Sequence, residues 1–323
     1  MDANNIIHDS CENVLDKMED NFITTIITDP PYGLKFKGNK WDYSIPSIEA
    51  FQKMFRVLKP GGTMLCFGGS RTFHRLAVNI EEAGFHIMDT IMWLYGSGFP
   101  KSVDIAYVID KNRNRLGDIQ QELIVNKNPM GGKHNEQKVI KINKPNSNEA
   151  EEWNGWGTAL KPSFEPILVC RKPIEGNYDD NALNWGVSGY WIDGARINTD
   201  GKHFGIKRTK EGRWPANVII NEEIKDELEN QKFGASNFFY CAKPTKEEKG
   251  LNNTHDTVKP LALIKYLCTL TKMPQGGIVL DPYAGSGTTG IACEEINRPY
   301  ILIEKEKENI DIIHERISKY KTL

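Results

Sequence analysis

Both ends of the chain alternate between apolar runs and segments with helical spacing, and no other feature restricts the fold as much. The runs FITTIIT (22–28), TMLCFGG (63–69) and FHIMDTIMWLY (85–95) are continuous and rich in β-branched or large apolar residues, as strands covered on both faces are. Apolar residues at helical spacing occur at 11–18, which follows the short run NII (5–7), at 47–62 and at 71–84. This alternation predicts a doubly wound α/β sheet.

The alternation stops after residue 95 and returns near residue 258 with a helix (259–270), a strand, a glycine loop, a helix (288–297), a strand (300–304) and a last helix at about 308–320. In between, SFEPILVCRKP (163–173) predicts one further strand. The flanking stretches show no clear period, and NKNPMGGKHNEQK (126–138) is typical of a mobile loop. We therefore divide the chain into 1–95, 96–162, 163–173, 174–257 and 258–323.

Composition excludes several classes of protein. With 323 residues and 39% hydrophobic residues, the chain can bury a large core. It contains no run of the roughly 18 apolar residues that a membrane span needs, and it begins without the pattern of a signal peptide, so we expect a cytosolic protein. The six cysteines are scattered and predict neither disulfides nor a metal site. The net charge of −2 hides two basic stretches, residues 111–144 and 201–213.

A glycine-rich turn, LDPYAGSGTTG (280–290), lies between a predicted strand and a predicted helix. Its glycines satisfy GxGxxG, and Glu304 ends the next strand, where a carboxylate can accept hydrogen bonds from ribose hydroxyls. No lysine follows the last glycine, which disfavours a nucleotide kinase. A dehydrogenase would build several strands after this loop, but only 33 residues follow Gly290. The remaining strands must then be the N-terminal ones, as in a circularly permuted Rossmann-like sheet.

A second feature, TDPPYG (28–33), ends a strand with an acid, two prolines and an aromatic residue. Two prolines cannot continue a sheet, because they lack the N–H groups of the ladder and fix their own φ angles. Such a turn holds a carboxylate, two carbonyls and a ring in fixed directions. The permuted order places it beside the glycine loop, at the edge of the sheet where ligands bind.

Together these residues resemble the amino-group DNA methyltransferases that use S-adenosylmethionine, in the beta subgroup, whose order is catalytic motif, recognition region, cofactor motif. The catalytic motif [DNS]PP[YFW] is matched by Asp29, Pro30, Pro31 and Tyr32. The cofactor motif FxGxG is matched by residues 283–287, with Tyr283 in place of phenylalanine. Lys259-Pro260 matches a further Lys-Pro signature, whereas His255-Asp256 departs from the frequent His-Pro before it. The resemblance covers 1–95 and 255–320.

The resemblance implies a class I methyltransferase fold, with 1–95 as the catalytic half and 258–323 as the cofactor-binding half of the core. It implies that Asp9 binds the adenine amine of the cofactor, that Glu304 binds its ribose and that the glycine loop contacts its methionine end. The implied cofactor residues are Asp9, Lys259, Asp281, Tyr283, Ala284, Gly285, Ser286, Gly287, Thr288 and Glu304. Two alternatives stay open, since Asp9 could be a helix N-cap and Lys259 a solvated lysine.

The implied reaction is methylation of an exocyclic amine, whose lone pair is delocalised into the base. Acceptors that hold the N–H groups out of the ring plane free this lone pair. We assign these roles to the Asp29 carboxylate and the Pro30 carbonyl, with Tyr32 stacked on the flipped base. Because position 29 is Asp, which goes mainly with adenine in this family, we expect N6-methyladenine.

The implied partner is double-stranded DNA in the cytoplasm of a bacterial or phage-infected cell, in association with the nucleoid. We expect 174–257 to be the target-recognition region and 96–162 to be a second DNA contact. The assigned phosphate contacts are Lys207, Arg208 and Lys210. A homodimer and a cognate restriction nuclease are left open. The alternatives are methylation of N4 of cytosine or of RNA adenine, and a catalytically silent partner that only binds nucleic acid.

Overall fold

The computed structural model describes residues 4–34, 42–96, 98, 102–126, 137–197, 212–242 and 258–321. The chain forms two compact units. The first comprises Met1–Gly96 and Phe164–Leu323, and the second is Ser97–Ser163.

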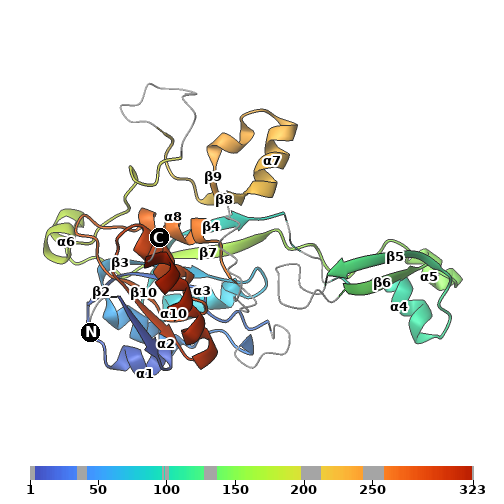
Figure 1. Ribbon diagram of the computed structural model, residues 1–323, viewed down its shortest axis with the longest axis horizontal. Helices are drawn as coiled ribbons and strands as arrows, with labels where there is room; N and C mark the ends of the chain where they lie inside the picture. Colours follow the sequence, from blue (N-terminus) through green and yellow to red (C-terminus); the bar gives the residue numbers. More distant parts are fainter. Residues whose placement is uncertain are drawn as a thin grey trace. The chain divides into compact units, whose positions relative to one another are not determined.

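The first unit is built on one large sheet (Figure 1), which has nine strands in the described part of the chain. Its order is β1-β11-β10-β2-β3-β7-β4-β8-β9. All neighbours are parallel except the two pairs that β7 makes. The strands are β1 Asn5–His8, β2 Ile23–Thr28, β3 Leu58–Phe67, β4 His86–Leu94, β7 Phe164–Arg171, β8 Val218–Asn221, β9 Tyr240–Ala242, β10 Val279–Asp281 and β11 Tyr300–Glu304.

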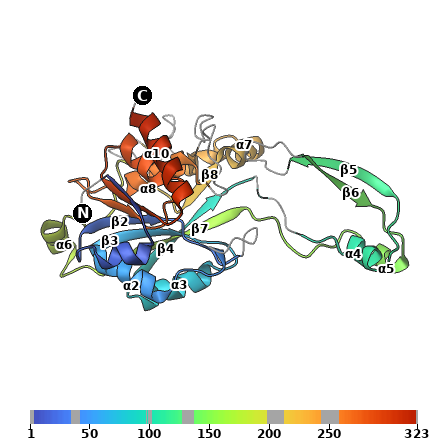
Figure 2. The ribbon, with the colours of Figure 1, turned by 60° about the horizontal axis from the view of Figure 1, so that its bottom comes forward.

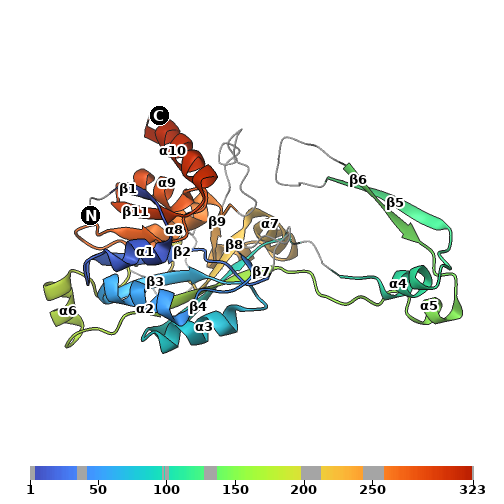
Figure 3. The same cartoon turned by 90° about the horizontal axis from the view of Figure 1, so that it is seen from below.

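Helices cover both faces of this sheet (Figures 2 and 3), and each face has its own apolar core. One core contains α1 (Cys11–Asp16), α2 (Ile48–Val57) and α3 (Phe73–Glu82). The other contains α8 (Leu261–Leu270), α9 (Thr288–Glu295) and α10 (Lys307–Lys321). The continuous apolar runs of the central strands are explained by this two-sided burial. The predicted doubly wound, mostly parallel fold is confirmed.

The permuted order is also confirmed by the strand neighbours. β10 pairs in parallel with β2, with Val279 opposite Thr25 and Leu280 opposite Ile26. The TDPPYG turn and the glycine loop therefore leave adjacent strands at the same edge. The direction of winding reverses between these two strands, because β10 leads through α9 to β11 whereas β2 leads through α2 to β3. Ligands of doubly wound sheets bind at such a switch point.

The predicted helix at 47–62 ends earlier than expected, because Leu58–Gly62 already belong to β3. The register between β2 and β3 shifts from Ile23 opposite Leu58 to Thr25 opposite Thr63, so the extra residues form a bulge. Gly61, with φ of +73°, supplies the left-handed conformation of this bulge. The start was predicted correctly: Ser47 caps α2 by accepting a hydrogen bond from the Ala50 amide.

The stretches predicted to be irregular contain regular elements. In the first unit these are α6 (Tyr178–Trp185), β8, α7 (Glu222–Gln231), the 3-10 helix η3 (Ala235–Phe238) and β9. The second unit contains α4 (Ile105–Asn112), the antiparallel pair β5 (Ile119–Asn126) and β6 (Gln137–Asn143), and α5 (Asn148–Glu152). Most of the predicted mobile loop 126–138 lies outside the described residues. Among the residues that the structure describes, no helix has the length and apolar character to span a membrane.

Candidate active site

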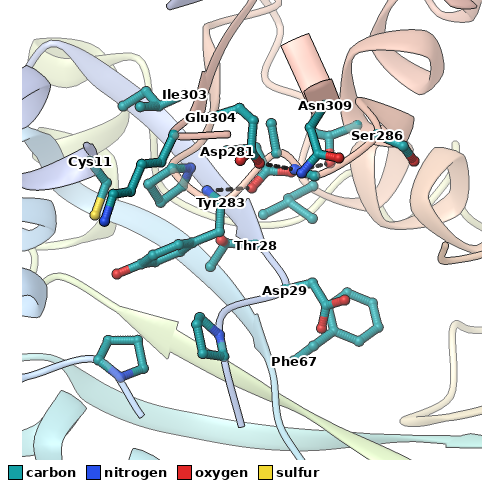
Figure 4. Close-up of a pocket in the computed structure, with 18 of the residues that line it drawn as sticks. Cys11, Thr28, Asp29, Phe67, Asp281, Tyr283, Ser286, Ile303, Glu304 and Asn309 are labelled. Atoms are coloured by element: carbon teal, nitrogen blue, oxygen red, sulfur yellow. Dashed lines mark hydrogen bonds between the residues drawn. The ribbon is translucent and has the colours of Figure 1, made fainter. Parts of the chain in front are cut away.

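A cavity of about 550 Å³ lies where β2 and β10 end (Figure 4). Its walls come from both halves of the sheet: Thr28 ends β2 and Asp29 follows it, Asp281 ends β10 and Tyr283 lies two residues later, and Glu304 ends β11. Lys259, just before α8, also lines it. The cavity thus joins the acid of the proline turn to the glycine loop.

The proline turn is held by a carboxylate outside the motif. Asp42 accepts hydrogen bonds from the backbone amides of Tyr32 at 2.7 Å, Gly33 at 2.9 Å and Leu34 at 3.2 Å. Its side chain is buried, and Gly33 has a φ of +68°. Three amides that point at one carboxylate form an anion-binding nest. Asp42 therefore fixes the backbone that follows Asp29, Pro30 and Pro31.

Four side chains form a hydrogen-bonded cluster at Asp29. The Tyr32 hydroxyl donates to Asp29 Oδ1 at 2.6 Å, and Lys259 Nζ lies 2.5 Å from Asp29 Oδ2. Both donors also lie near Glu165 Oε2, which is 3.1 Å from the Tyr32 hydroxyl and 3.3 Å from Lys259 Nζ. Glu165 comes from β7, the antiparallel strand. The cluster contains two carboxylates and one ammonium group.

The environment fixes the protonation of both donors. Burial disfavours the charged form of Lys259, but the carboxylates of Asp29 and Glu165 outweigh burial and raise its pKa above the usual range. Burial and the same carboxylates raise the pKa of Tyr32 well above its usual value. Lys259 remains a cation and Tyr32 a neutral donor over the physiological pH range.

The glycine loop is positioned by close packing and by α10. Gly287 has a φ of +77°, and a Cβ atom there would lie 2.9 Å from the Ile313 side chain, so a larger residue does not fit. Arg316 of α10 donates to the Ser286 carbonyl at 2.6 Å, to the Ser286 hydroxyl at 2.8 Å and to Thr288 Oγ1 at 3.2 Å. The loop is therefore held by helix α10 as well as by its own glycines.

Two buried carboxylates flank the loop. Asp281 accepts from Thr289 Oγ1 at 2.6 Å and from the Tyr283 amide at 3.2 Å, and burial raises the pKa of Asp281 to about 7 despite these bonds. Glu304 accepts from the amides of Gly285 and Glu306, each at 2.8 Å. In the described part of the chain, neither carboxylate belongs to a recorded ion pair. Both are suited to a ligand that brings positive charge or hydroxyl groups.

Tyr283 replaces the phenylalanine of the usual motif and adds a hydroxyl. This side chain hydrogen-bonds Cys11, at the start of α1. Burial raises the pKa of the Cys11 thiol to about 12, so it remains protonated. The extra hydroxyl is thus satisfied inside the protein, and the ring stays available as a wall of the cavity.

Most of the residues assigned from sequence lie around this cavity. Those that line it are Asp29, Pro31, Lys259, Asp281, Tyr283, Ala284, Gly285, Ser286, Thr288 and Glu304. Pro30, Tyr32 and Gly287 lie in the same two turns without lining it. Asp9 is not among the lining residues. It binds the Ser10 amide and the Asn13 side chain, while Ser10 is the N-cap of α1.

The structure does not describe the assigned phosphate contacts, and three residues of the site were not predicted. Lys207, Arg208 and Lys210 lie outside the described residues, so their assignment stays a prediction. Sequence reasoning missed Asp42, which lies eight to ten residues from its partners and belongs to no motif, and it missed Glu165 and Arg316, whose contacts are more distant along the chain. The only local signal is the position of Glu165, an acid at the start of an otherwise apolar strand.

Comparisons with known proteins identify the family of this chain. A family model described as DNA methylase, of the N6/N4 family, matches residues 23–315. M.HindIII of Haemophilus influenzae, a type II methyltransferase, is 31% identical over 269 residues, which cover 81% of this chain and 65% of that protein. This chain therefore spans slightly less than two thirds of M.HindIII. M.HpaI of Haemophilus parainfluenzae is 26% identical over 319 residues, which cover 95% of this chain and 73% of that protein.

Among solved structures, M1.HpyAVI is 18% identical with a TM-score of 0.49, over 97% of this chain and 98% of that chain. The family match confirms the resemblance drawn from the motifs and, with it, S-adenosylmethionine as the cofactor. The match spans nearly the whole chain and includes both the proline turn and the glycine loop. This chain belongs to the N6/N4 DNA methylase family.

Proposed function

We propose that this protein methylates DNA on the N6 amine of adenine, with S-adenosylmethionine as methyl donor. One observation carries the proposal: Asp29, the acid of the proline turn, opens into the same cavity as the glycine loop, Asp281 and Glu304. An amine acceptor and a cofactor cradle therefore share one space at the switch point of the sheet.

The residues of the cavity fit S-adenosylmethionine. Gly285, with a φ of +52°, lines the cavity with backbone and no side chain, and Gly287, with a φ of +77°, lets the loop pack against Ile313. Glu304 has lone pairs left for ribose hydroxyls, and Asp281 can face a cationic group. Tyr283 supplies an aromatic wall. When bound, the cofactor supplies a methyl group on a positively charged sulfur, which leaves as a neutral thioether.

The protein's own contribution is positioning and charge. The Asp29 carboxylate and the Pro30 carbonyl accept the two N–H groups of the target amine, which frees its lone pair. Asp42 keeps the turn rigid through three backbone amides. As the nitrogen becomes positive, the cluster of Asp29, Glu165 and Lys259, with one net negative charge, stabilises the positive charge, and the methylated nitrogen then releases its proton to solvent water.

The target base must leave the duplex to reach Asp29, which costs a few kcal/mol. Stacking on an aromatic ring can offset about 1–3 kcal/mol of this cost. The aromatic rings near Lys259 are those of Tyr32 and Phe67. The second unit and residues 174–257 are the proposed DNA-contacting parts. A homodimer and a cognate nuclease remain predictions.

Cytosine carries the same kind of amine, so the choice of adenine rests on the carboxylate at position 29. The test is expression in a bacterial host that lacks DNA methylation, followed by modification-aware sequencing and nucleoside analysis. We expect N6-methyladenine at one short sequence, and none with the Asp29→Ala variant. N4-methylcytosine without N6-methyladenine would contradict the choice of adenine. Unmodified DNA would contradict the proposed DNA methyltransferase activity.

A further inference from the structure

Both oxygens of the Asp29 carboxylate already bind donors of the protein. Oδ1 accepts from the Tyr32 hydroxyl at 2.6 Å, and Oδ2 is paired with Lys259 Nζ at 2.5 Å. The proposed function requires the same carboxylate to accept an N–H group of the target amine. The protein's own donors and the substrate therefore compete for Asp29.

The two donors that hold Asp29 share a second acceptor. A single atom, Glu165 Oε2, lies 3.1 Å from the Tyr32 hydroxyl and 3.3 Å from Lys259 Nζ. Both distances are longer than the corresponding distances to Asp29. The donors thus favour Asp29 in this structure, yet only small movements separate them from Glu165.

The burial of the cluster makes this second acceptor necessary. The exposed fractions of the Lys259, Glu165 and Asp29 side chains are 10%, 22% and 26%. Lys259 Nζ also lies 5.1 Å from the centre of the Phe67 ring and 5.5 Å from that of Tyr32, so rings confine it. A nearly buried ammonium that loses its carboxylate must find another, because an unpaired buried charge is strongly disfavoured.

We propose that Glu165 is a positioning residue that accepts the Tyr32 hydroxyl and the Lys259 ammonium when the Asp29 carboxylate turns to the target amine. This inference rests on the proposed methyltransferase function. Glu165 does not touch the reacting atoms. It determines whether Asp29 is available to them.

The main test compares single and double variants of the purified full-length protein. The substrate is an unmodified duplex that carries the sequence that the native protein methylates. Glu165→Gln removes the charge that draws Lys259 away, so methyl transfer should fall by about tenfold or more, since each 1.4 kcal/mol corresponds to a factor of ten. Cofactor affinity, measured by calorimetry, should stay within about twofold. In the double variant Glu165→Gln/Lys259→Met, the competing ammonium is gone, and much of the lost rate should return.

The chain supplies a matched control pair. Lys265 of α8 and Glu295 of α9 also form an ion pair, at 2.7 Å, and neither lines the cavity. Glu295→Gln and Lys265→Met should leave the transfer rate within about twofold of the native protein, as is usual for surface pairs.

A binding readout separates this role from a purely structural one. The native protein should bind a duplex with adenine at the target position more tightly than one with purine, which lacks the amine. The Glu165→Gln variant should lose most of this preference, because Asp29 stays occupied. Glu165→Asp serves as a second variant should Glu165→Gln fail to fold. It keeps the charge but shortens the side chain, which withdraws the carboxylate from Tyr32 and Lys259, so the preference for adenine should fall while cofactor affinity stays within about twofold.

The inference is overturned if Glu165→Gln transfers methyl groups at the native rate, if the double variant is no faster than the single one, or if Glu165→Asp keeps the native preference for adenine. A native protein that methylates no DNA contradicts the proposed function instead. The two failures are therefore distinguishable.

Discussion

At the scale of single residues, the site depends on carboxylates whose surroundings give each a different task. Asp29 accepts from Tyr32 and Lys259, Asp42 accepts from backbone amides, and Asp281 is buried beside the glycine loop. The sequence revealed Asp29 and Asp281 because both end apolar strands. It did not reveal Asp42 or Glu165, because the sequence does not show which amides or which ammonium group an isolated acid binds.

Asp42→Asn should loosen the proline turn. An amide has only one acceptor oxygen, and its NH2 group would face backbone amides that need acceptors, so we expect a loss of about 1–3 kcal/mol in the free energy of unfolding. Methyl transfer should fall while cofactor affinity changes little. Thermal unfolding and transfer rates check this against Asp16→Asn, a change at an exposed acid. Equal stability of Asp42→Asn and the native protein would contradict the role.

Asp281 should make cofactor binding depend on pH. Because burial raises the pKa of Asp281 to about 7, the carboxyl group is neutral at lower pH and ionised at higher pH. A cationic ligand prefers the ionised form, so affinity for S-adenosylmethionine should rise as pH increases from 6 to 8. One linked proton gives at most about a tenfold change per pH unit. Calorimetry at several pH values measures this, and Asp281→Asn should flatten the profile. A flat profile in the native protein would exclude this linkage.

At the scale of elements, the sequence predicted the helices and strands whose own residues show a clear apolar pattern. β2 was predicted from a continuous β-branched run, α2 from apolar residues at helical spacing, and β7 from the segment SFEPILVCRKP. β8 and β9, with four and three residues, are too short to show a period. The pair β5 and β6 was missed because its strands are rich in polar residues and Lys, which are typical of loops.

Helix α10 should contribute to cofactor binding through Arg316. Arg316→Met removes three hydrogen bonds to residues 286 and 288, and the loop between β10 and α9 should become less ordered. The affinity for S-adenosylmethionine should fall by about three- to tenfold, which corresponds to the loss of roughly one net hydrogen bond. Lys319→Met, on the same helix and paired with Glu315, serves as control. Unchanged affinity in Arg316→Met would show that the glycines alone hold the loop.

At the scale of the whole molecule, the second unit is inserted between two strands that pair directly. β4 ends at Leu94, which lies opposite Phe164, the first residue of β7. A short turn could therefore join them. The second unit also exposes an aromatic pair, Trp153 and Trp156, with ring centres 5.8 Å apart and exposed fractions of 44% and 60%. An exposed pair of this kind suits a contact with another molecule.

Replacing residues 97–162 with Asn-Gly should leave a five-residue hairpin loop between β4 and β7. We expect the shortened protein to fold and to bind S-adenosylmethionine within about threefold of the native affinity, because the cavity belongs to the first unit alone. Its affinity for the recognition duplex should fall strongly. Calorimetry and a DNA-binding titration measure both. Native DNA affinity in the shortened protein would place DNA recognition in residues 174–257 alone.

The central claim is that Asp29 serves the target amine and not the cofactor. The most direct measurement pairs the transfer rate with cofactor affinity in Asp29→Asn, whose amide keeps the shape of the side chain and removes its charge. Methyl transfer should fall by about 10²–10³-fold, as for the loss of one preorganised electrostatic group, and the calorimetric affinity for S-adenosylmethionine should stay nearly native. A variant that transfers methyl groups at the native rate, or one that loses the cofactor in proportion to its rate, would contradict this assignment.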